Sequence, residues 1–267
     1  MRTVGIVVAA GSGTRLGHRE PKALVHLAGR PLVWHAARRL VDAGCDQIIV
    51  SAPPDRIDDV AAAVFGPTNG AESPESAATP GALLGESAVG WTSSDDPQRH
   101  IEVGGTVCPG GPSRQESVVR ALAAADPRKA EVVLVHDAAR PLAPVAMIAS
   151  VIDAVRAGAH AVIPGLPVAD TIKRVRGDVV AETVDRAELV AVQTPQGFDF
   201  ATLYRAHRAG RDLAADERTA VSDDAGLVER FLDVSVHVVP GDDRAMKVTT
   251  AADLALAEAL LANGTWS

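Results

Sequence analysis

V-V-A-A-G-S-G-T-R-L-G at residues 7–17, with Pro21 and Lys22 after it, is the most informative part of this chain. The apolar run 4–10 predicts a buried strand, and the small residues beyond it allow the backbone to turn sharply and present its N–H groups to an anion. Arg15 and Lys22 add two cations beside the same turn. The stretch therefore predicts a phosphate-binding turn, made of Ala9, Ala10, Gly11, Ser12 and Gly13.

The glycine spacing of this turn differs from the two common nucleotide-binding motifs. Gly17 lies one residue too late for G-x-G-x-x-G, and no Gly-Lys-Ser/Thr follows as in a P-loop. The full pattern A-A-G-x-G-x-R-x-x-x-x-x-P-K instead resembles the signature of the sugar-nucleotide pyrophosphorylase superfamily. The plainer alternative is an ordinary strand-to-helix turn with two surface cations, and the number of matching positions favours the nucleotide-binding interpretation.

Length and composition predict one domain spanning residues 1–267. Hydrophobic residues make up 47% and aromatic residues only 3%, so the core consists of aliphatic side chains that suit parallel strands buried under helices. The net charge of −8 argues against a nucleic-acid partner, and no apolar run approaches the length of a membrane span. Cys45 and Cys108 lack any metal-binding or redox spacing, which predicts free thiols and a cytoplasmic location.

Predicted strands and helices alternate along the chain. The strands expected after the first are 45–51, 132–136, 161–164 and 234–239. The expected helices are 32–42, 117–125, 144–157, 200–207 and 251–261, the last with Thr250 and Asp253 in capping-box spacing. Such alternation predicts an α/β fold: a mostly parallel twisted sheet with helices on both faces, Rossmann-like, with ligands at the carboxyl ends of the strands.

Two segments interrupt this alternation. Residues 66–99 are rich in Gly, Pro, Ser, Ala and acidic residues without any sustained period, which predicts a mobile surface insertion. In the second segment, the runs 171–175 and 179–184 flank Arg176-Gly177-Asp178. That arrangement predicts a β-hairpin projecting from the sheet.

Three further motifs lie where ligands are expected. G-G-P-S-R-Q-E-S at 110–117 is a second glycine turn before a helix, where N–H groups can bind a base or a phosphate, although an ordinary helix start explains it equally well. H-D-A-A-R-P at 136–141 places Asp137 at the carboxyl end of a strand, where it would meet a cation or a ligand hydroxyl. The alternative is a structural Asp that caps the next segment. G-D-D-R-A-M-K-V-T at 241–249 brings two carboxylates near Lys247, and a solvated acidic turn is its plainer interpretation.

With T-V-D-R at 183–186 and Q-T-P-Q-G-F at 193–198, these motifs resemble, in type and order, those of the 2-C-methyl-D-erythritol 4-phosphate cytidylyltransferase family. The resemblance covers nearly all of the chain outside residues 66–99. It implies a nucleotidyltransferase fold and the transfer of CMP from CTP to methylerythritol 4-phosphate, with Mg²⁺ or another divalent cation, in isoprenoid precursor synthesis. It also implies a homodimer with shared active sites, whose hairpin arms at 165–192 cross between subunits.

The resemblance assigns roles to individual residues. It implies that Arg15 and Lys22 stabilise the charge on the α-phosphate and the departing pyrophosphate. It implies that Lys247 and Arg186, the latter supplied by the neighbouring subunit, hold the acceptor phosphate. The full set implied around the acceptor is Asp137, Arg140, Thr171, Arg186 and Lys247.

The same resemblance implies a nucleotide site and a metal site. Asp137 and Asp243 are the implied metal ligands. The residues implied around CTP are Ala9, Ala10, Gly11, Ser12, Gly13, Gly110, Gly111, Arg114, Ser117, Asp137 and Ala138. For Arg114, the alternative is that it braces the second glycine turn.

Three other functions stay open at this point. A ribitol 5-phosphate cytidylyltransferase differs mainly in its acceptor pocket. A non-catalytic nucleotide-binding regulatory module is a second alternative, which the intact charged residues disfavour. A hydride-transfer enzyme with a Rossmann turn is the third alternative. Two features disfavour it: the third glycine is out of register, and Val50-Ser51-Ala52 stands at the end of the second strand, where such enzymes carry an acidic residue.

Overall fold

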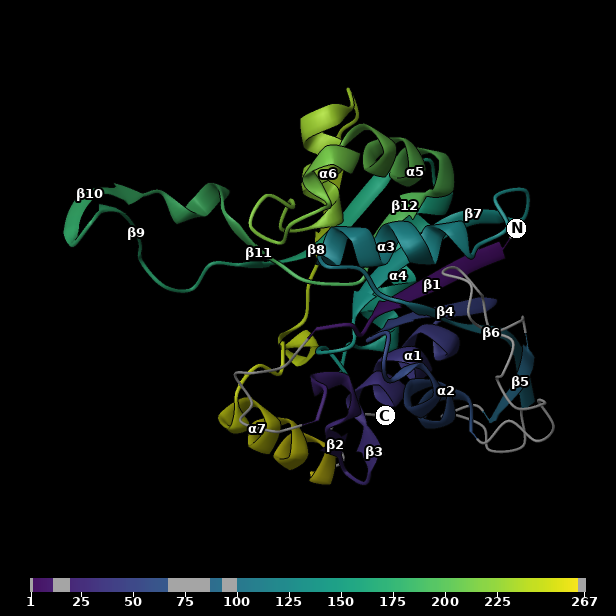
Figure 1. Cartoon of the computed structure of the whole chain (residues 1–267). Helices are drawn as coiled ribbons and strands as arrows, with labels where there is room; N and C mark the ends of the chain where they lie inside the picture. Colours follow the sequence, from purple (N-terminus) through teal and green to yellow (C-terminus); the bar gives the residue numbers. More distant parts are fainter. Residues whose placement is uncertain (1, 12–19, 67–86, 93–99, 264–267) are drawn as a thin grey trace.

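The computed structural model describes residues 2–11, 20–66, 87–92 and 100–263. Within these ranges the main sheet has nine strands in the order β11-β8-β12-β7-β1-β4-β6-β5, with β13 beside β8 (Figure 1). The strands of this sheet are β1 (Arg2–Val8), β4 (Gln47–Ala52), β5 (Ser87–Thr92), β6 (His100–Pro109), β7 (Ala130–Asp137), β8 (Ala161–Pro167), β11 (Val190–Val192), β12 (Gln196–Asp199) and β13 (Val236–Pro240).

The helices between these strands match the alternation that the sequence predicts. The α-helices are α1 (Leu32–Asp42), α2 (Ile57–Phe65), α3 (Arg114–Ala123), α4 (Val145–Arg156), α5 (Phe200–Ala209), α6 (Asp224–Phe231) and α7 (Ala251–Ala262). Short 3₁₀ helices are η2 (Lys22–Leu24), η3 (Arg186–Glu188), η4 (Arg211–Leu213) and η5 (Asp243–Ala245), and β2 (His26–Leu27) pairs with β3 (Arg30–Pro31) in a small hairpin.

The strand directions bring the predicted ligand-binding loops to one edge of the sheet. β1 runs parallel to β4 and β7, and β4 runs parallel to β6. β12 is antiparallel to both β7 and β8, so β8 runs in the same direction as β7, and β13 is parallel to β8. The loops after β1, β6, β7 and β13 therefore leave the sheet at the same edge, where the fold class predicts the ligand site.

Alternate side chains of the central strands enter two separate hydrophobic clusters. Val7 and Leu134 belong to the cluster that includes residues of α1, α2 and α4. Ile6 and Val133 belong to the cluster that includes residues of α3, α5 and α6. Because successive strand residues point to opposite faces, helices cover both faces of the sheet, and the prediction of a mostly parallel α/β fold is confirmed.

Some predicted boundaries agree closely with the structure and one prediction needs correction. Helix α1 spans the predicted residues, and Thr250 with Asp253 forms the predicted capping box of α7. Segment 66–99, expected to be an aperiodic insertion, contains strand β5, which pairs antiparallel with β6 at the sheet edge. Residues 67–86 and 93–99 lie outside the described ranges.

A long arm extends from the β8 end of the sheet (Figure 1). At its base β8 and β11 pair antiparallel, and its outer part is the hairpin of β9 (Ile172–Arg176) and β10 (Val179–Val184). Residues of both hairpin strands are exposed almost throughout. The predicted projecting hairpin is confirmed.

Candidate active site

A cavity of about 500 Å³ opens at the carboxyl edge of the sheet. Most of its wall comes from four separate stretches of sequence: the first glycine turn with η2, the second glycine turn with the start of α3, the end of β7, and the loop after β13. The lining residues are Val8, Ala9, Ala10, Gly11, Lys22, Ala23, Gly111, Pro112, Ser113, Arg114, Ser117, Asp137, Ala138, Ala139, Glu217, Lys247 and Thr249.

The first wall of the cavity is the turn after β1 together with η2. Ala9, Ala10, Gly11 and Lys22 all line the cavity, as the sequence predicts. The N–H of Ala9 donates to the carbonyl of Ser51 at 2.9 Å, so that group is already used inside the sheet. The predicted residues Ser12, Gly13 and Arg15 lie outside the described ranges.

The second glycine turn is built for close packing. A side chain at Gly110 would lie 2.3 Å from the Ala10 Cβ, and one at Gly111 would lie 2.1 Å from the Glu116 side chain. The Gly110 N–H donates to Ala52 and the Gly111 N–H donates to the Ser117 hydroxyl. These two N–H groups, expected to bind base or phosphate, are therefore engaged within the chain, and Gly110 allows the two turns to approach each other.

Ser117 has a bracing contact in addition to its place in the cavity wall. Its hydroxyl is buried, accepts from the Gly111 N–H at 3.0 Å and donates to the Ser113 carbonyl at 2.8 Å. Ser113 in turn caps α3 by accepting from the Glu116 N–H, and its own hydroxyl donates to the Ala214 carbonyl. These bonds fix the second turn against the start of α3.

Asp137 is the central charge of the cavity. Its Oδ2 lies 2.7 Å from the Lys247 Nζ and its Oδ1 lies 3.3 Å from the Arg114 Nε, although only 8% of the residue is exposed. Burial alone would raise the pKa of this carboxyl, but the charges of Arg114 and Lys247 outweigh burial and hold the pKa well below its usual range. Asp137 is thus an ionised carboxylate held between two cations.

The loop after β13 carries Lys247 to this position because several bonds fix it. The Gln193 side chain both donates to and accepts from the backbone of Asp242. The Val248 N–H donates to the Ala139 carbonyl at 2.8 Å. The backbone next to Lys247 is therefore tied directly to the segment that follows Asp137.

His136 stabilises the end of β7 from within the protein. Its Nε2 lies 3.1 Å from the Arg140 carbonyl and its Nδ1 lies 3.0 Å from the Thr194 hydroxyl. The same hydroxyl accepts from the Asp137 N–H. Burial lowers the pKa of His136 to about 4, so the ring is neutral at pH 7 and orients Asp137 without adding charge.

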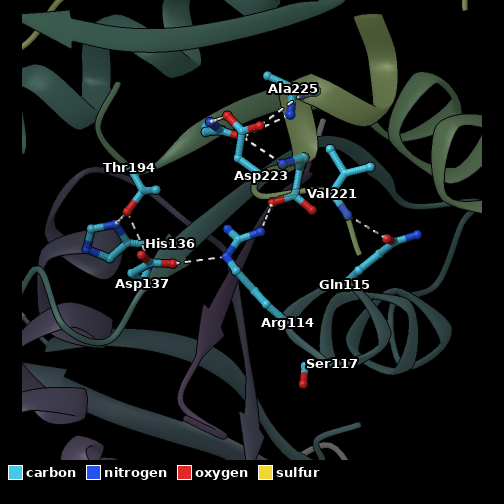
Figure 2. Close-up of polar contacts among 12 residues, drawn as sticks. Arg114, Gln115, Ser117, His136, Asp137, Thr194, Val221, Asp223 and Ala225 are labelled. Atoms are coloured by element: carbon cyan, nitrogen blue, oxygen red, sulfur yellow. Dashed lines mark hydrogen bonds and ion pairs between the residues drawn. The ribbon is translucent and has the colours of Figure 1, made fainter. Parts of the chain in front are cut away.

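Arg114 joins Asp137 to a second, fully buried carboxylate. Figure 2 shows Arg114 reaching toward Asp137 from the start of α3. Its Nη1 also lies 2.7 Å from the Oδ2 of Asp224, the first residue of α6, and the other oxygen of Asp224 lies 2.9 Å from the His207 Nε2. Sequence reasoning missed Asp224 and His207, because neither belongs to a recognised motif, and no local pattern indicates that their helices meet at Arg114.

Five predicted residues of the described ranges are not among those that line the cavity, and one of them is Gly110, which packs behind the wall against Ala10. Arg186 and Thr171 lie on the exposed arm, where the Arg186 guanidinium donates to the Ala169 carbonyl. Asp243 lies in η5 and is not among the lining residues. Arg140 also does not line the cavity; its guanidinium donates to the carbonyls of Ala245 and Val192.

Of the two predicted metal ligands, Asp137 lines the cavity and Asp243 does not. In the described ranges no group of three or more His, Cys, Asp or Glu side chains is arranged to hold a metal ion. Glu217 also lines the cavity, but its carboxylate accepts from the Arg114 N–H at 2.8 Å. Mg²⁺ commonly binds through one or two carboxylates plus substrate phosphates, and Asp137 is a carboxylate in the cavity wall that fits such a site.

Fold and site together define a nucleotidyltransferase: a glycine turn with a lysine faces a second cation across a cavity at the carboxyl ends of parallel strands. The family model of 2-C-methyl-D-erythritol 4-phosphate cytidylyltransferase matches residues 93–263. The model of the MobA-like NTP transferase domain matches residues 5–88. The chain belongs to the 2-C-methyl-D-erythritol 4-phosphate cytidylyltransferase family.

Individual relatives agree with this assignment. The chain is 44% identical to 2-C-methyl-D-erythritol 4-phosphate cytidylyltransferase of Streptomyces coelicolor, over 98% of this chain and 85% of that protein. It is 42% identical to the protein of the same name from Saccharopolyspora erythraea, over 98% of this chain and all of that one. The crystal structure of 2-C-methyl-D-erythritol 4-phosphate cytidylyltransferase from Thermus thermophilus matches with a TM-score of 0.66 and 32% identity, over 97% of this chain and 98% of that chain.

Membership of this family sets aside two of the alternatives, the hydride-transfer enzyme and the non-catalytic module. The chain is a cytidylyltransferase of isoprenoid biosynthesis by family. Among the helices in the described ranges, none combines the length and the apolar character that crossing a bilayer requires.

Proposed function

We propose that this chain joins CTP to 2-C-methyl-D-erythritol 4-phosphate, giving 4-diphosphocytidyl-2-C-methyl-D-erythritol and pyrophosphate, in the cavity between Lys22 and Lys247. The observation that carries the proposal is the arrangement of that cavity. Two lysines from opposite ends of the sequence line one space, together with an ionised carboxylate, Asp137, held by Lys247. A site of this kind suits a reaction between two phosphate anions.

The reaction needs positive charge more than it needs a nucleophilic side chain. An oxygen of the acceptor phosphate attacks the α-phosphorus of CTP, the new P–O bond forms, and the bond to the β-phosphate breaks to release pyrophosphate. Two anions approach each other only if cations neutralise them and hold them in line. We assign this task to Lys22 on the CTP side and to Lys247 on the acceptor side, with Arg15 added from the family resemblance.

Asp137 has two functions in this proposal. Its contact with Lys247 fixes the ammonium group on the acceptor side of the cavity, 2.7 Å from the carboxylate. It is also the residue that we propose to hold Mg²⁺, which when bound would neutralise part of the triphosphate charge. Because the pKa of Asp137 lies well below its usual range, the carboxylate is ionised throughout the neutral pH range.

The nucleotide would lie against the two glycine turns. Ala10, Gly11 and Gly111 line the cavity with small residues, so no bulky side chain of these three positions enters it. The space is narrow at this point, since the Gly110 backbone packs against Ala10. A confined base site of this size favours a pyrimidine over a purine.

The arm supports a homodimer with shared active sites. Its outer hairpin exposes Val175, Val179 and Val180, with exposed fractions of 56%, 64% and 55%. Val175 and Val180 are cross-strand partners and lie side by side on one face of the hairpin, and such exposed apolar pairs on a projecting hairpin suit a protein–protein interface. We propose that the arms of two chains exchange and that Arg186 and Thr171 of each chain complete the acceptor site of the other.

A pyrophosphate-release assay with purified protein tests the proposed reaction. It pairs each of the four nucleoside triphosphates with methylerythritol 4-phosphate or with ribitol 5-phosphate. The expected result is Mg²⁺-dependent turnover with CTP and methylerythritol 4-phosphate only. Turnover with ribitol 5-phosphate alone would replace the acceptor in the proposal, and no turnover with any pair would refute it.

A further inference from the structure

A continuous series of polar contacts leads from a buried histidine outside the cavity to the centre of the cavity. It starts at His207, whose Nε2 lies 2.9 Å from Asp224 Oδ1, and continues from Asp224 Oδ2 to Arg114 Nη1 at 2.7 Å. Arg114 Nε then lies 3.3 Å from Asp137 Oδ1, and Asp137 Oδ2 lies 2.7 Å from Lys247. The contact of Arg114 with Asp224 is thus the shorter of its two ion pairs.

Asp224 is fixed in place by more than its ion pair. Only 1% of the residue is exposed, and its N–H donates to the Gln196 Oε1 at 3.1 Å. It is the first residue of α6, where the helix dipole favours a negative charge, and Asp223 caps the same helix. Burial would raise the pKa of Asp224, but the Arg114 charge and the His207 hydrogen bond outweigh burial and lower it. Asp224 is therefore a rigid anionic anchor.

This anchor determines how Arg114 meets Asp137. A guanidinium group beside a single carboxylate prefers to donate two parallel hydrogen bonds to it. Here Nη1 donates to Asp224 at 2.7 Å, and of the two donors on the opposite side of the guanidinium only Nε reaches Asp137, while Nη2 is buried without a hydrogen-bond partner among the described residues. Arg114 is therefore held away from its best geometry with Asp137, and the second oxygen of Asp137 is left to Lys247.

His207 contributes by orienting the anchor. Its Nε2–H donates to the Asp224 oxygen that does not face Arg114, which fixes the rotation of the carboxylate. The residue is 3% exposed, and Nδ1 has no hydrogen-bond partner within the described ranges. Burying Nδ1 without a hydrogen bond costs free energy of folding. The hydrogen bond from Nε2 to Asp224 is therefore the polar contact that a buried histidine provides at this position.

We infer that Asp224 and His207 are positioning residues of the transfer reaction, which hold Arg114 so that Asp137 stays available to Lys247. This inference rests on the proposed function. Neither residue lines the cavity, so neither is expected to touch the substrates. Loss of either one lets Arg114 turn fully onto Asp137 and draws that carboxylate away from Lys247.

The test compares kcat, the two KM values and the melting temperature across matched variants. Asp224→Asn and His207→Leu are each expected to lower kcat by about tenfold or more, since small displacements of charged groups at a reacting centre have effects of this size. The KM for CTP is expected to stay within about twofold, because the glycine turns are untouched. His207→Gln places an N–H donor where Nε2 lies and is expected to restore most of the lost kcat.

His160→Leu is the matched control. His160 makes a hydrogen bond of similar length, 2.8 Å, to Asp199, but its side chain is exposed and does not line the cavity. This variant is expected to keep the wild-type kcat. The wild-type enzyme is measured in the same assay to separate the two proposals. If the wild type shows no turnover, the proposed function fails. If the wild type turns over but the variants match it, only the positioning role fails.

A double variant decides whether His207 acts through Arg114. Lysine at position 114 lacks the planar guanidinium group that contacts both Asp224 and Asp137. If His207 acts through that group, adding His207→Leu to Arg114→Lys is expected to change kcat by less than about twofold. The inference is overturned if folded Asp224→Asn and His207→Leu proteins keep the wild-type kcat. It is equally overturned if His207→Gln fails to recover activity, or if the effect of His207→Leu is the same in both backgrounds.

Discussion

The cavity and the arm hold their charged residues in opposite ways. In the cavity, Asp137 is almost fully buried and lies between Arg114 and Lys247, and each of these groups is fixed by elements far apart in sequence. On the arm, polar contacts stay local: Lys173 donates to Thr183 within one exposed hairpin. The cavity is organised by its own chain, whereas the arm makes little contact with the rest of that chain.

This difference indicates which part of the chemistry one chain can perform. The side of the cavity that we propose for CTP is lined by residues of the same chain that provides Lys22. Arg186 and Thr171, which the family resemblance assigns to the acceptor side, lie on the arm away from their own cavity. Substitutions of cavity residues are therefore expected to lower the activity of every chain that carries them. Substitutions on the arm are expected to act only through association of two chains.

The largest effect is expected for Lys22→Ala. Removal of a preorganised cation beside the triphosphate should lower kcat by about a hundredfold or more, because the charge acts mainly in the transition state. Steady-state kinetics with CTP and methylerythritol 4-phosphate measure this. Lys129→Ala, which removes an exposed lysine paired with Asp126, is the matched control and should be neutral. Near-normal turnover of folded Lys22→Ala protein contradicts the assigned role.

The next effect concerns the apolar face of the arm. Val175 and Val180 are cross-strand partners in the hairpin and both are exposed. If the proposed dimer forms through this face, replacing both by Lys should dissociate it and lower activity by about tenfold or more, because charges in an apolar interface are costly to bury. Sedimentation and activity are measured together.

The control for the arm variant is Leu256→Lys, which adds a charge at an exposed apolar position on α7, outside the arm. It should leave both the association state and the activity unchanged. A monomeric arm variant with full activity would show that each chain works alone, and the contrast between cavity and arm would then lose its functional meaning.

The smallest expected effect is a pH dependence of the free energy of unfolding, and it comes from the buried His136 beside the cavity. Burial lowers the pKa of His136 from 6.5 to about 4, so between these values the unfolded chain binds a proton that the folded chain does not. The free energy of unfolding should therefore fall as the pH drops below 6.5, by about 1 kcal/mol per pH unit from this one group. Urea unfolding at a series of pH values from neutral down to mildly acidic measures the slope.

His136→Gln removes the titrating group and should give a shallower slope over the same range. If the slopes of His136→Gln and wild type coincide, the buried neutral state of His136 is not the source of the pH dependence.

The sequence predicts those parts of the molecule whose causes are local. Helix α1 begins after Pro31 and ends before Gly44, and the capping box of α7 follows from Thr250 and Asp253, so these bounds can be recognised from neighbouring residues. Asp137 is expected in the site because it follows a buried strand, and the cavity lining includes it.

Features that depend on distant pairing could not be predicted. β5 belongs to a segment without periodicity and is a strand because β6 offers an edge for pairing. The contact between Arg114 and Asp224 spans 110 positions in sequence, and no local pattern specifies it. The residues at 223–226 do carry a helix-start signal, in which Asp223 caps α6, but that signal gives no indication of a catalytic neighbourhood.

Mixing two inactive variants tests the proposed sharing of active sites between chains most directly. Lys22→Ala and Arg186→Ala chains are purified separately, mixed in equal amounts under conditions of subunit exchange, and assayed, with exchange verified by pull-down of differently tagged chains. If each site combines Lys22 of one chain with Arg186 of the other, random pairing should restore about a quarter of wild-type activity. Mixtures that exchange subunits but remain inactive would contradict the account, because Arg186 would then act within its own chain or not at all.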